Sequence, residues 1–228
     1  ISVTGVQTCA LPISLLASCA LILAFNTPAM SDSSNFAGPY IGLQASSIGA
    51  GVGGKKTGGV DDVNESTVVS AGKSGVVAGL EAGYAIPLGS SLLLDIGGSY
   101  IDGTVSLRHS SDDVADSGDV KFQASQFYTY YVAPTIVLSD TSSLFVKFGQ
   151  QEATVDVTGD VTNPGDLEGT TYAVGTRTVL DSGIFIRAEA GYTEFDALNA
   201  SGAGVAQGGI PTTTKYVADP EIAYGAIS

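Results

Sequence analysis

Cysteine and histidine are almost missing from this chain. Its 228 residues include two cysteines, Cys9 and Cys19, and one histidine, His109. Because both cysteines fall in the first twenty residues, the remainder cannot form a disulfide framework, a thiolate zinc site or a cysteine nucleophile. A single histidine also excludes a histidine-based metal cluster. We therefore expect no metal site and no cofactor.

Basic residues are also scarce. Nine Lys and Arg face 23 Asp and Glu, which gives a formal net charge of −14. The field of such a polyanion repels phosphate, so nucleic acid is not an expected partner. Charged residues make up only 14% of the chain and hydrophobic residues 44%, which is too apolar for a disordered protein. The length allows one domain or at most two small ones.

The first thirty residues are expected to lie outside the fold. The apolar run Leu15–Phe25 has the length of a signal-peptide core and is too short to span a bilayer as a helix. Thr27-Pro28-Ala29 then resembles a small-residue cleavage site, and we expect an export signal cut near Ala29. Leu16-Ala17-Ser18-Cys19 resembles a lipobox, but the apolar run continues past Cys19, so lipidation is disfavoured.

The expected domain limits follow from this leader. Residues 3–13 resemble a translated sequencing adaptor, and the export signal follows them. We therefore expect residues 1–30 to be a leader and residues 31–228 to form the folded domain.

From about Gly38 onward the apolar residues repeat with period two, which is typical of β-strands, and no stretch has a clean helical period. Eight strand-like segments follow one another: Pro39–Ile48, Gly75–Ile86, Leu92–Leu107, Val120–Leu138, Ser143–Val157, Thr170–Leu180, Gly183–Asp196 and Lys215–Ile227.

The connections between these segments alternate in length. The short ones are Pro87–Ser91, Ser139–Ser142 and Asp181–Gly183. The long ones are Gly49–Ser74, His109–Asp119, Thr158–Gly169 and Ala197–Thr214. Short periplasmic turns and long external loops are typical of bacterial outer-membrane barrels. The pattern predicts an all-β fold, an eight-stranded antiparallel up-and-down transmembrane β-barrel.

Two features indicate that the apolar face of the strands is the outer face. The polar face is rich in glycine, which makes room for larger side chains inside a narrow barrel: Gly79, Gly83, Gly97, Gly149, Gly175 and Gly191. Tyrosines near strand ends are expected to form girdles at the membrane interfaces: Tyr84, Tyr100, Tyr128, Tyr130, Tyr172, Tyr192 and Tyr224. A lipocalin-like soluble barrel, with the opposite polarity, is the alternative fold.

The chain resembles the small outer-membrane β-barrel proteins of Gram-negative bacteria, the OmpA/OmpX type. The residues that carry the likeness are Phe36–Leu43, the hairpin from Tyr130–Pro134 through Asp140–Gly149, and Arg187–Tyr192. The resemblance implies an eight-stranded barrel in the outer membrane, in contact with lipid and lipopolysaccharide. Such barrels usually finish with an aromatic residue, whereas this sequence stops at Ser228, so a few further residues are expected.

Six charged residues on the polar face form the candidate functional site, here called the lumenal charge cluster: Glu81, Asp95, Lys147, Arg177, Arg187 and Glu189. Each lies about four to seven residues from a short turn, so all six are expected at a similar depth in the periplasmic half. Glu81 and Asp95 lie on the second and third strands, and Lys147 and Arg177 on the fifth and sixth, so the principal ion pairs must cross the lumen. The seventh strand adds one residue of each sign. A closed, salt-bridged plug is the favoured role because unpaired buried charges are costly. A gated ion path is the alternative.

The external loops are acidic and offer no catalytic site. Divalent cations could link the carboxylates of these loops to lipopolysaccharide phosphates, but no loop has the residue spacing of a calcium-binding loop. The carboxylates are Asp61, Asp62, Glu65, Asp112, Asp113, Asp116, Asp119, Asp160, Asp166 and Glu168. In His109-Ser110-Ser111, adjacent residues of a strand point to opposite faces and no carboxylate is placed to orient the imidazole.

The sequence therefore predicts a protein without enzymatic activity. Its expected role is envelope integrity or surface interaction through the external loops, with a loop partner that the sequence does not identify. A small diffusion pore and a lipid A-modifying enzyme are the alternatives.

Overall fold

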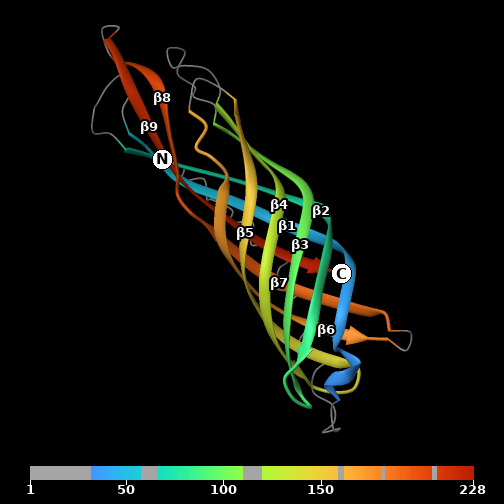
Figure 1. The fold of residues 1–228 in the computed structure, drawn as a ribbon. Coiled ribbons are helices and arrows are strands. Elements are labelled where there is room, and N and C mark those ends of the chain that lie inside the picture. The colour runs from blue at the N-terminus through green and yellow to red at the C-terminus, as the bar shows by residue number, and fades with distance from the viewer. Residues whose placement is uncertain (1–31, 58–65, 110–119, 159–161, 181–182, 207–209) are drawn as a thin grey trace, which may run out of the picture.

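The computed structural model of the chain describes residues 32–57, 66–109, 120–158, 162–180, 183–206 and 210–228. A short 3-10 helix is followed by strands that form one long barrel (Figure 1). The elements are η1 (Ser33–Asn35), β1 (Gly38–Thr57), β2 (Ser66–Pro87), β3 (Leu92–His109), β4 (Val120–Val137), β5 (Ser142–Thr158), β6 (Leu167–Val179), β7 (Phe185–Phe195), β8 (Leu198–Ala206) and β9 (Ile210–Ile227). No helix in these described ranges is long and apolar enough to cross a membrane.

The sheet closes on itself with eight strand positions. Strands β1 to β7 pair in chain order, β9 follows β7, and β9 pairs back with β1 from Ala45↔Ile227 to Thr57↔Lys215. Strands β7 and β8 occupy one position, since β7 pairs with residues 221–227 of β9 and β8 with residues 210–218. All pairings are antiparallel, so the predicted eight-stranded up-and-down barrel is confirmed.

The strands are longer than the sequence pattern predicted. Gly49–Ser74 was expected to be a loop, yet β1 continues to Thr57 and β2 already begins at Ser66. Ala197–Thr214 was also expected to be a loop, whereas β8 and the first part of β9 form a hairpin there. Both expectations were wrong because glycine- and threonine-rich residues can satisfy their backbone groups by pairing with neighbouring strands. Their described inward side chains are mostly small, as at buried Ala50 and Ala200, so the sequence shows only a weak apolar pattern.

The two faces of the wall alternate as predicted. In β5, residues Phe145, Lys147, Gln151, Ala153 and Val155 are buried, and the residues between them are mostly more exposed. The glycines of the inner face lie beneath large side chains. A Cβ atom on Gly97 would lie 2.6 Å from the Tyr131 hydroxyl, and one on Gly191 would lie 2.5 Å from Tyr224 Cζ. These glycines therefore allow aromatic rings to lie flat against the barrel wall.

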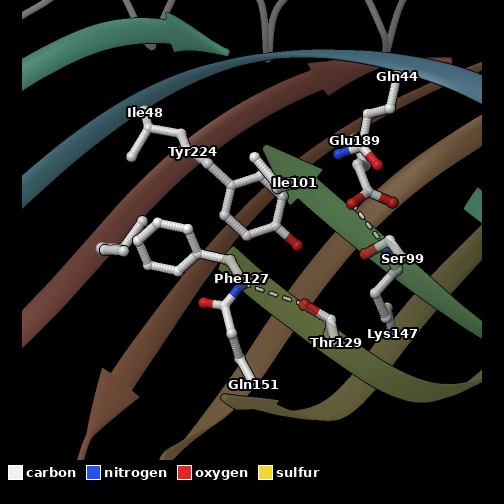
Figure 2. A pocket seen from close by; sticks show the side chains of 11 residues that line it. Gln44, Ile48, Ser99, Ile101, Phe127, Thr129, Lys147, Gln151, Glu189 and Tyr224 are labelled. Atoms are coloured by element: carbon white, nitrogen blue, oxygen red, sulfur yellow. Dashed lines mark hydrogen bonds and ion pairs between the residues drawn. The ribbon is translucent and has the colours of Figure 1, made fainter. Parts of the chain in front are cut away.

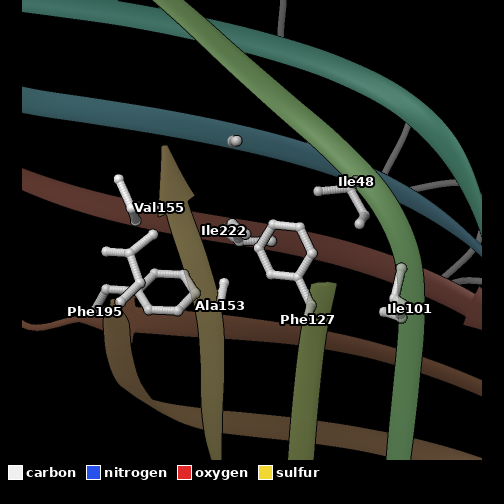
Figure 3. Close-up of a cluster of buried hydrophobic side chains, with 9 residues drawn as sticks. Ile48, Ile101, Phe127, Ala153, Val155, Phe195 and Ile222 are labelled. Carbon is white, nitrogen blue, oxygen red and sulfur yellow. The ribbon is translucent and has the colours of Figure 1, made fainter. Parts of the chain in front are cut away.

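Side chains fill the lumen in layers along the barrel axis. At the short-turn end, Phe36 joins Ala85, Leu93 and Val137 in an apolar layer. At the long-loop end lies a larger apolar layer, drawn in Figure 3: Ile48, Ala50, Ile101, Phe127, Ala153, Val155, Leu167, Phe195 and Ile222. Polar and charged side chains occupy the section between them, and the candidate site lies there.

The N-terminal segment closes the short-turn end. The Ser33 amide donates to the Ser90 carbonyl at 2.9 Å, and its hydroxyl donates to the Gly89 carbonyl at 2.7 Å. Asn35 Nδ2 donates to the Asp140 carbonyl at 3.1 Å. Helix η1 is thus bound to both the β2–β3 and the β4–β5 turns, which holds Phe36 in the lumen opening.

Candidate functional site

The structure places all six residues of the lumenal charge cluster inside the barrel. They project inward from β2, β3, β5, β6 and β7, and no side chain is more than 5% exposed. Strand alternation explains the direction, because each residue shares the inward parity of the glycines on its own strand. Three carboxylates and three cations make the cluster neutral, although the whole chain is strongly acidic.

The ion pairs cross between strands that are not adjacent in the barrel. Lys147 Nζ on β5 donates to Glu189 Oε1 on β7 at 2.6 Å. Arg187 Nη1 on β7 lies 2.9 Å from Glu81 Oε1 on β2. Pairing across the lumen connects opposite walls, so the cluster fixes the barrel cross-section at this level.

Arg187 connects two of the carboxylates. Besides Glu81, its Nε lies 3.3 Å from Glu189 Oε2, in ion-pair contact without hydrogen-bond geometry. The guanidinium carbon lies 3.9 Å from the centroid of the Phe145 ring, which gives a cation–π contact. Arg187 is 1% exposed. It is therefore held by charge on one side and by an aromatic ring on another.

Tyr131 links the cluster to a second tyrosine. Its hydroxyl donates to Glu81 Oε1 at 2.5 Å and accepts from Arg187 Nη1 at 3.3 Å. The Tyr40 hydroxyl lies 2.8 Å from that of Tyr131. Because Tyr131 has one hydroxyl proton, which it gives to Glu81, Tyr40 must be the donor in the tyrosine pair.

The ion pair of Arg177 with Asp95 lies nearer the short-turn end. Arg177 Nη2 donates to Asp95 Oδ2, and Nη1 lies 3.5 Å from the Phe36 carbonyl. The guanidinium also lies over the rings of Tyr40 and Phe185, at 4.9 Å and 5.4 Å from their centroids. This pair therefore contacts the apolar layer that Phe36 completes.

A layer of amides and hydroxyls lies between the charges and the apolar layer of the long-loop end (Figure 2). Gln151 Nε2 donates to Thr129 Oγ1 at 3.0 Å, whereas Gln151 Oε1 is buried without a hydrogen-bond partner in the described part of the chain. A cavity of about 10 Å³ adjoins these side chains and those of Lys147 and Glu189. That volume holds about one water molecule.

Sequence reasoning missed the aromatic part of this site. Tyr40, Tyr131, Phe145 and Phe185 contact the cluster and were given no role. Parity could have identified Tyr131, because it alternates with Tyr130, which was predicted to face outward.

Six of the seven tyrosines predicted for the girdles face outward: Tyr84, Tyr100, Tyr128, Tyr130, Tyr172 and Tyr192. Tyr130 is the most exposed of them at 61%. The assignment of Tyr224 to the girdle was wrong. Its ring packs into the lumen beside the large apolar layer and lies against Gly191. Its parity in β9 matches that of buried Ile222 and Ala226, and the sequence pattern alone did not set this parity.

The loop carboxylates fall mostly outside the described residues; Asp166 and Glu168, which are described, are exposed. Ser110 and Ser111 are also outside, and His109 ends β3. Among the residues that the structure describes, no three His, Cys, Asp or Glu side chains are grouped to hold a metal ion.

A closed antiparallel barrel with an apolar outer face and a charged lumen defines a transmembrane β-barrel. The family model of the outer membrane protein beta-barrel domain matches residues 17–209. The chain therefore belongs to the outer membrane protein beta-barrel family, and its location is the bacterial outer membrane. The short turns are the periplasmic end of such a barrel and the long loops the external end.

The other comparisons add little. No curated protein is significantly similar in sequence. Two solved structures of Ail, the attachment invasion locus protein of Yersinia pestis, are similar to the chain at 12% and 14% identity. Both matches cover 82% of this chain and 99% of the other, with TM-scores of 0.29 and 0.34. The second Ail structure contains the heparin analogue sucrose octasulfate.

Proposed function

We propose that this protein is a non-enzymatic, closed barrel that contributes to envelope integrity or to interactions at the cell surface. The observation that carries the proposal is the described part of the lumen, where two apolar layers enclose a neutral charge cluster. Strands β1 and β2 are also longer than one membrane crossing requires. A filled lumen favours a role for the outer surface over a role in transport.

Strand length supports a role for the external part. A tilted transmembrane strand needs about 9–11 residues. Strand β1 has 20 residues and β2 has 22, and they pair along 20 residues from Gly38↔Ala85 to Thr57↔Ser66. About half of this hairpin therefore extends beyond the bilayer, where it forms a surface of extended sheet. The loops at its tips are suited to contact a partner of the cell surface.

The lumenal charge cluster is proposed to fill the middle section of the closed lumen and to hold its walls together. Its pairs link β2 with β7, β3 with β6 and β5 with β7, so side chains reach across the barrel from several directions. Neutrality and near-complete burial favour a fixed structural plug over a hydrated ion path, which would expose charge of one sign.

Lipid and lipopolysaccharide are the proposed partners of the outer face. The outward tyrosines are placed to hold their rings in the apolar region and their hydroxyls among the headgroups. Among them, the Tyr192 hydroxyl donates to Glu221 Oε2 at 2.6 Å. This contact fixes one ring of the external girdle.

The experiment compares cells that lack the gene with cells that carry the wild type or a shortened barrel. In the shortened variant, residues 52–71 are replaced by a tight turn, because Gly51 and Gly72 are paired partners in β1 and β2. Uptake of a hydrophobic dye measures envelope integrity, and settling of cells in suspension measures surface interaction. We expect gene loss to change at least one readout, and the shortened barrel to restore dye exclusion only.

Two other results would contradict the proposal. If cells with and without the gene match in both readouts, the proposed role is wrong. If lipid A from the two strains differs in mass, the protein is an enzyme that modifies lipid A. Heat-modifiable migration on a gel serves as the control that each variant forms a closed barrel.

A further inference from the structure

The charged section of the lumen lies between two apolar layers, and this order was not visible in the sequence. Phe36, Ala85, Leu93 and Val137 lie on its periplasmic side. The nine-residue layer around Phe127 and Phe195 lies on its external side. An ion entering from either end would meet an apolar constriction before it met a charge.

The two kinds of layer differ in how well they can hold water. The polar section contains the 10 Å³ cavity and several buried polar atoms that have no hydrogen-bond partner in the described residues. These atoms include Gln151 Oε1, Asp95 Oδ1 and Arg187 Nη2. Water that reached this section would find hydrogen-bonding partners there.

The external apolar layer differs in this respect, because none of its described members has a polar side-chain atom. All nine members are aliphatic or phenylalanine side chains with 9% exposure or less, contributed by seven of the strands. Figure 3 shows the Phe127, Phe195 and Ile222 side chains pointing into the same space. Apolar constrictions stop ions by excluding water, since an ion that loses its hydration shell gains nothing in return.

We propose that this external apolar layer is the permeability barrier of the barrel, and that the lumenal charge cluster is not. The cluster holds the walls together, whereas the apolar layer keeps water and ions from passing. The inference rests on the proposed closed barrel and assigns the closure to a different set of residues. The periplasmic layer is the weaker barrier because it depends on Phe36, which the N-terminal segment supplies from outside the strands.

The test compares two double variants in planar bilayers. In the first, Phe127→Ser and Phe195→Ala open the external layer. In the second, Lys147→Met and Glu189→Gln remove the Lys147–Glu189 pair and the contact of Arg187 with Glu189, while the cluster stays neutral. We expect wild type and the charge variant to show no conductance steps, and the apolar-layer variant to show steps that grow with salt concentration.

A labelling measurement accompanies the conductance. Gln151 lies directly beneath the layer, in the wall of the cavity. A Gln151→Cys substitution, with Cys9 and Cys19 changed to Ser, introduces the chain's only thiol. In lipid nanodiscs, a charged thiol reagent should modify this thiol in the apolar-layer background and leave it unmodified in the wild-type and charge-variant backgrounds.

The outcomes separate the two proposals. Conductance steps from the charge variant and none from the apolar-layer variant would overturn the inference. The charge cluster would then be the permeability barrier. The inference would also be overturned if neither double variant showed conductance steps while both formed heat-modifiable barrels and the thiol stayed unmodified. Steps from wild type would instead refute the closed barrel itself and support the diffusion pore.

Discussion

Arg187→Met should be among the most damaging single substitutions in the barrel. The side chain is almost fully buried and contacts two carboxylates, at 2.9 Å for Glu81 and 3.3 Å for Glu189. At an effective dielectric constant of about 20, the shorter contact corresponds to roughly 6 kcal/mol of Coulomb attraction. Removing one partner of a buried pair typically costs about 3–5 kcal/mol, because the remaining carboxylate stays buried without its cation. We expect Arg187→Met to lower the free energy of unfolding by about 3–5 kcal/mol.

Unfolding in urea, followed by circular dichroism in detergent micelles, measures this loss. A double-mutant cycle with Glu81→Leu gives the decisive comparison. Because replacing a whole buried ion pair by apolar side chains is often neutral, Glu81→Leu combined with Arg187→Met should be more stable than Arg187→Met alone. Additive losses in the double variant, or an Arg187→Met protein within about 0.5 kcal/mol of wild type, would refute the reasoning.

Three further predictions concern the walls of the lumen and the lipid-facing surface. Tyr131→Phe should lower the free energy of unfolding by about 1.5–3 kcal/mol because it removes hydrogen bonds to charged groups. Tyr130→Phe, on the outer face, should change it by no more than about 0.5 kcal/mol. Unfolding in urea measures both. Gly97→Ala should cost about 1–3 kcal/mol because its Cβ would overlap the tyrosine hydroxyl, whereas Gly89→Ala has open space around it and should be nearly neutral; equal unfolding midpoints would contradict this packing. Val174→Lys should destabilise the barrel by about 2–4 kcal/mol in lipid vesicles, because it places a charge on the apolar outer face; an unchanged stability in vesicles would show that this face does not meet lipid.

Much of the fold was predictable because a membrane barrel imposes a strict pattern on its strands. The period of two, the alternation of short and long connections and the glycines of the inner face all follow from closing a narrow barrel in lipid. The six residues of the lumenal charge cluster could be assigned to the lumen for the same reason, since the lipid-facing section of the strands does not tolerate charge. These properties are local to each strand, so a single sequence displays them.

The sequence did not determine the lengths of the strands outside the membrane or the face of Tyr224. The described inward residues of the external hairpins are mostly small, so their apolar alternation is weak. The outer part of β1 also pairs with β9, far away in the chain. In β9 the parity is set by pairing with β1 and β7. Tyrosine suits either a membrane interface or a lumen, so its residue type does not decide between them.

The sequence by itself determined the barrel, its polarity and the residue types that fill it. Only the tertiary structure decided which charge meets which. Arg187 contacts both Glu81 and Glu189, and Arg177 contacts Asp95. Strand register and barrel closure bring these residues to one level, although positions 81 and 187 are 106 residues apart in the chain. The layering of charge between two apolar sections has the same origin, since each layer is assembled from one or two side chains per strand and no single strand contains it.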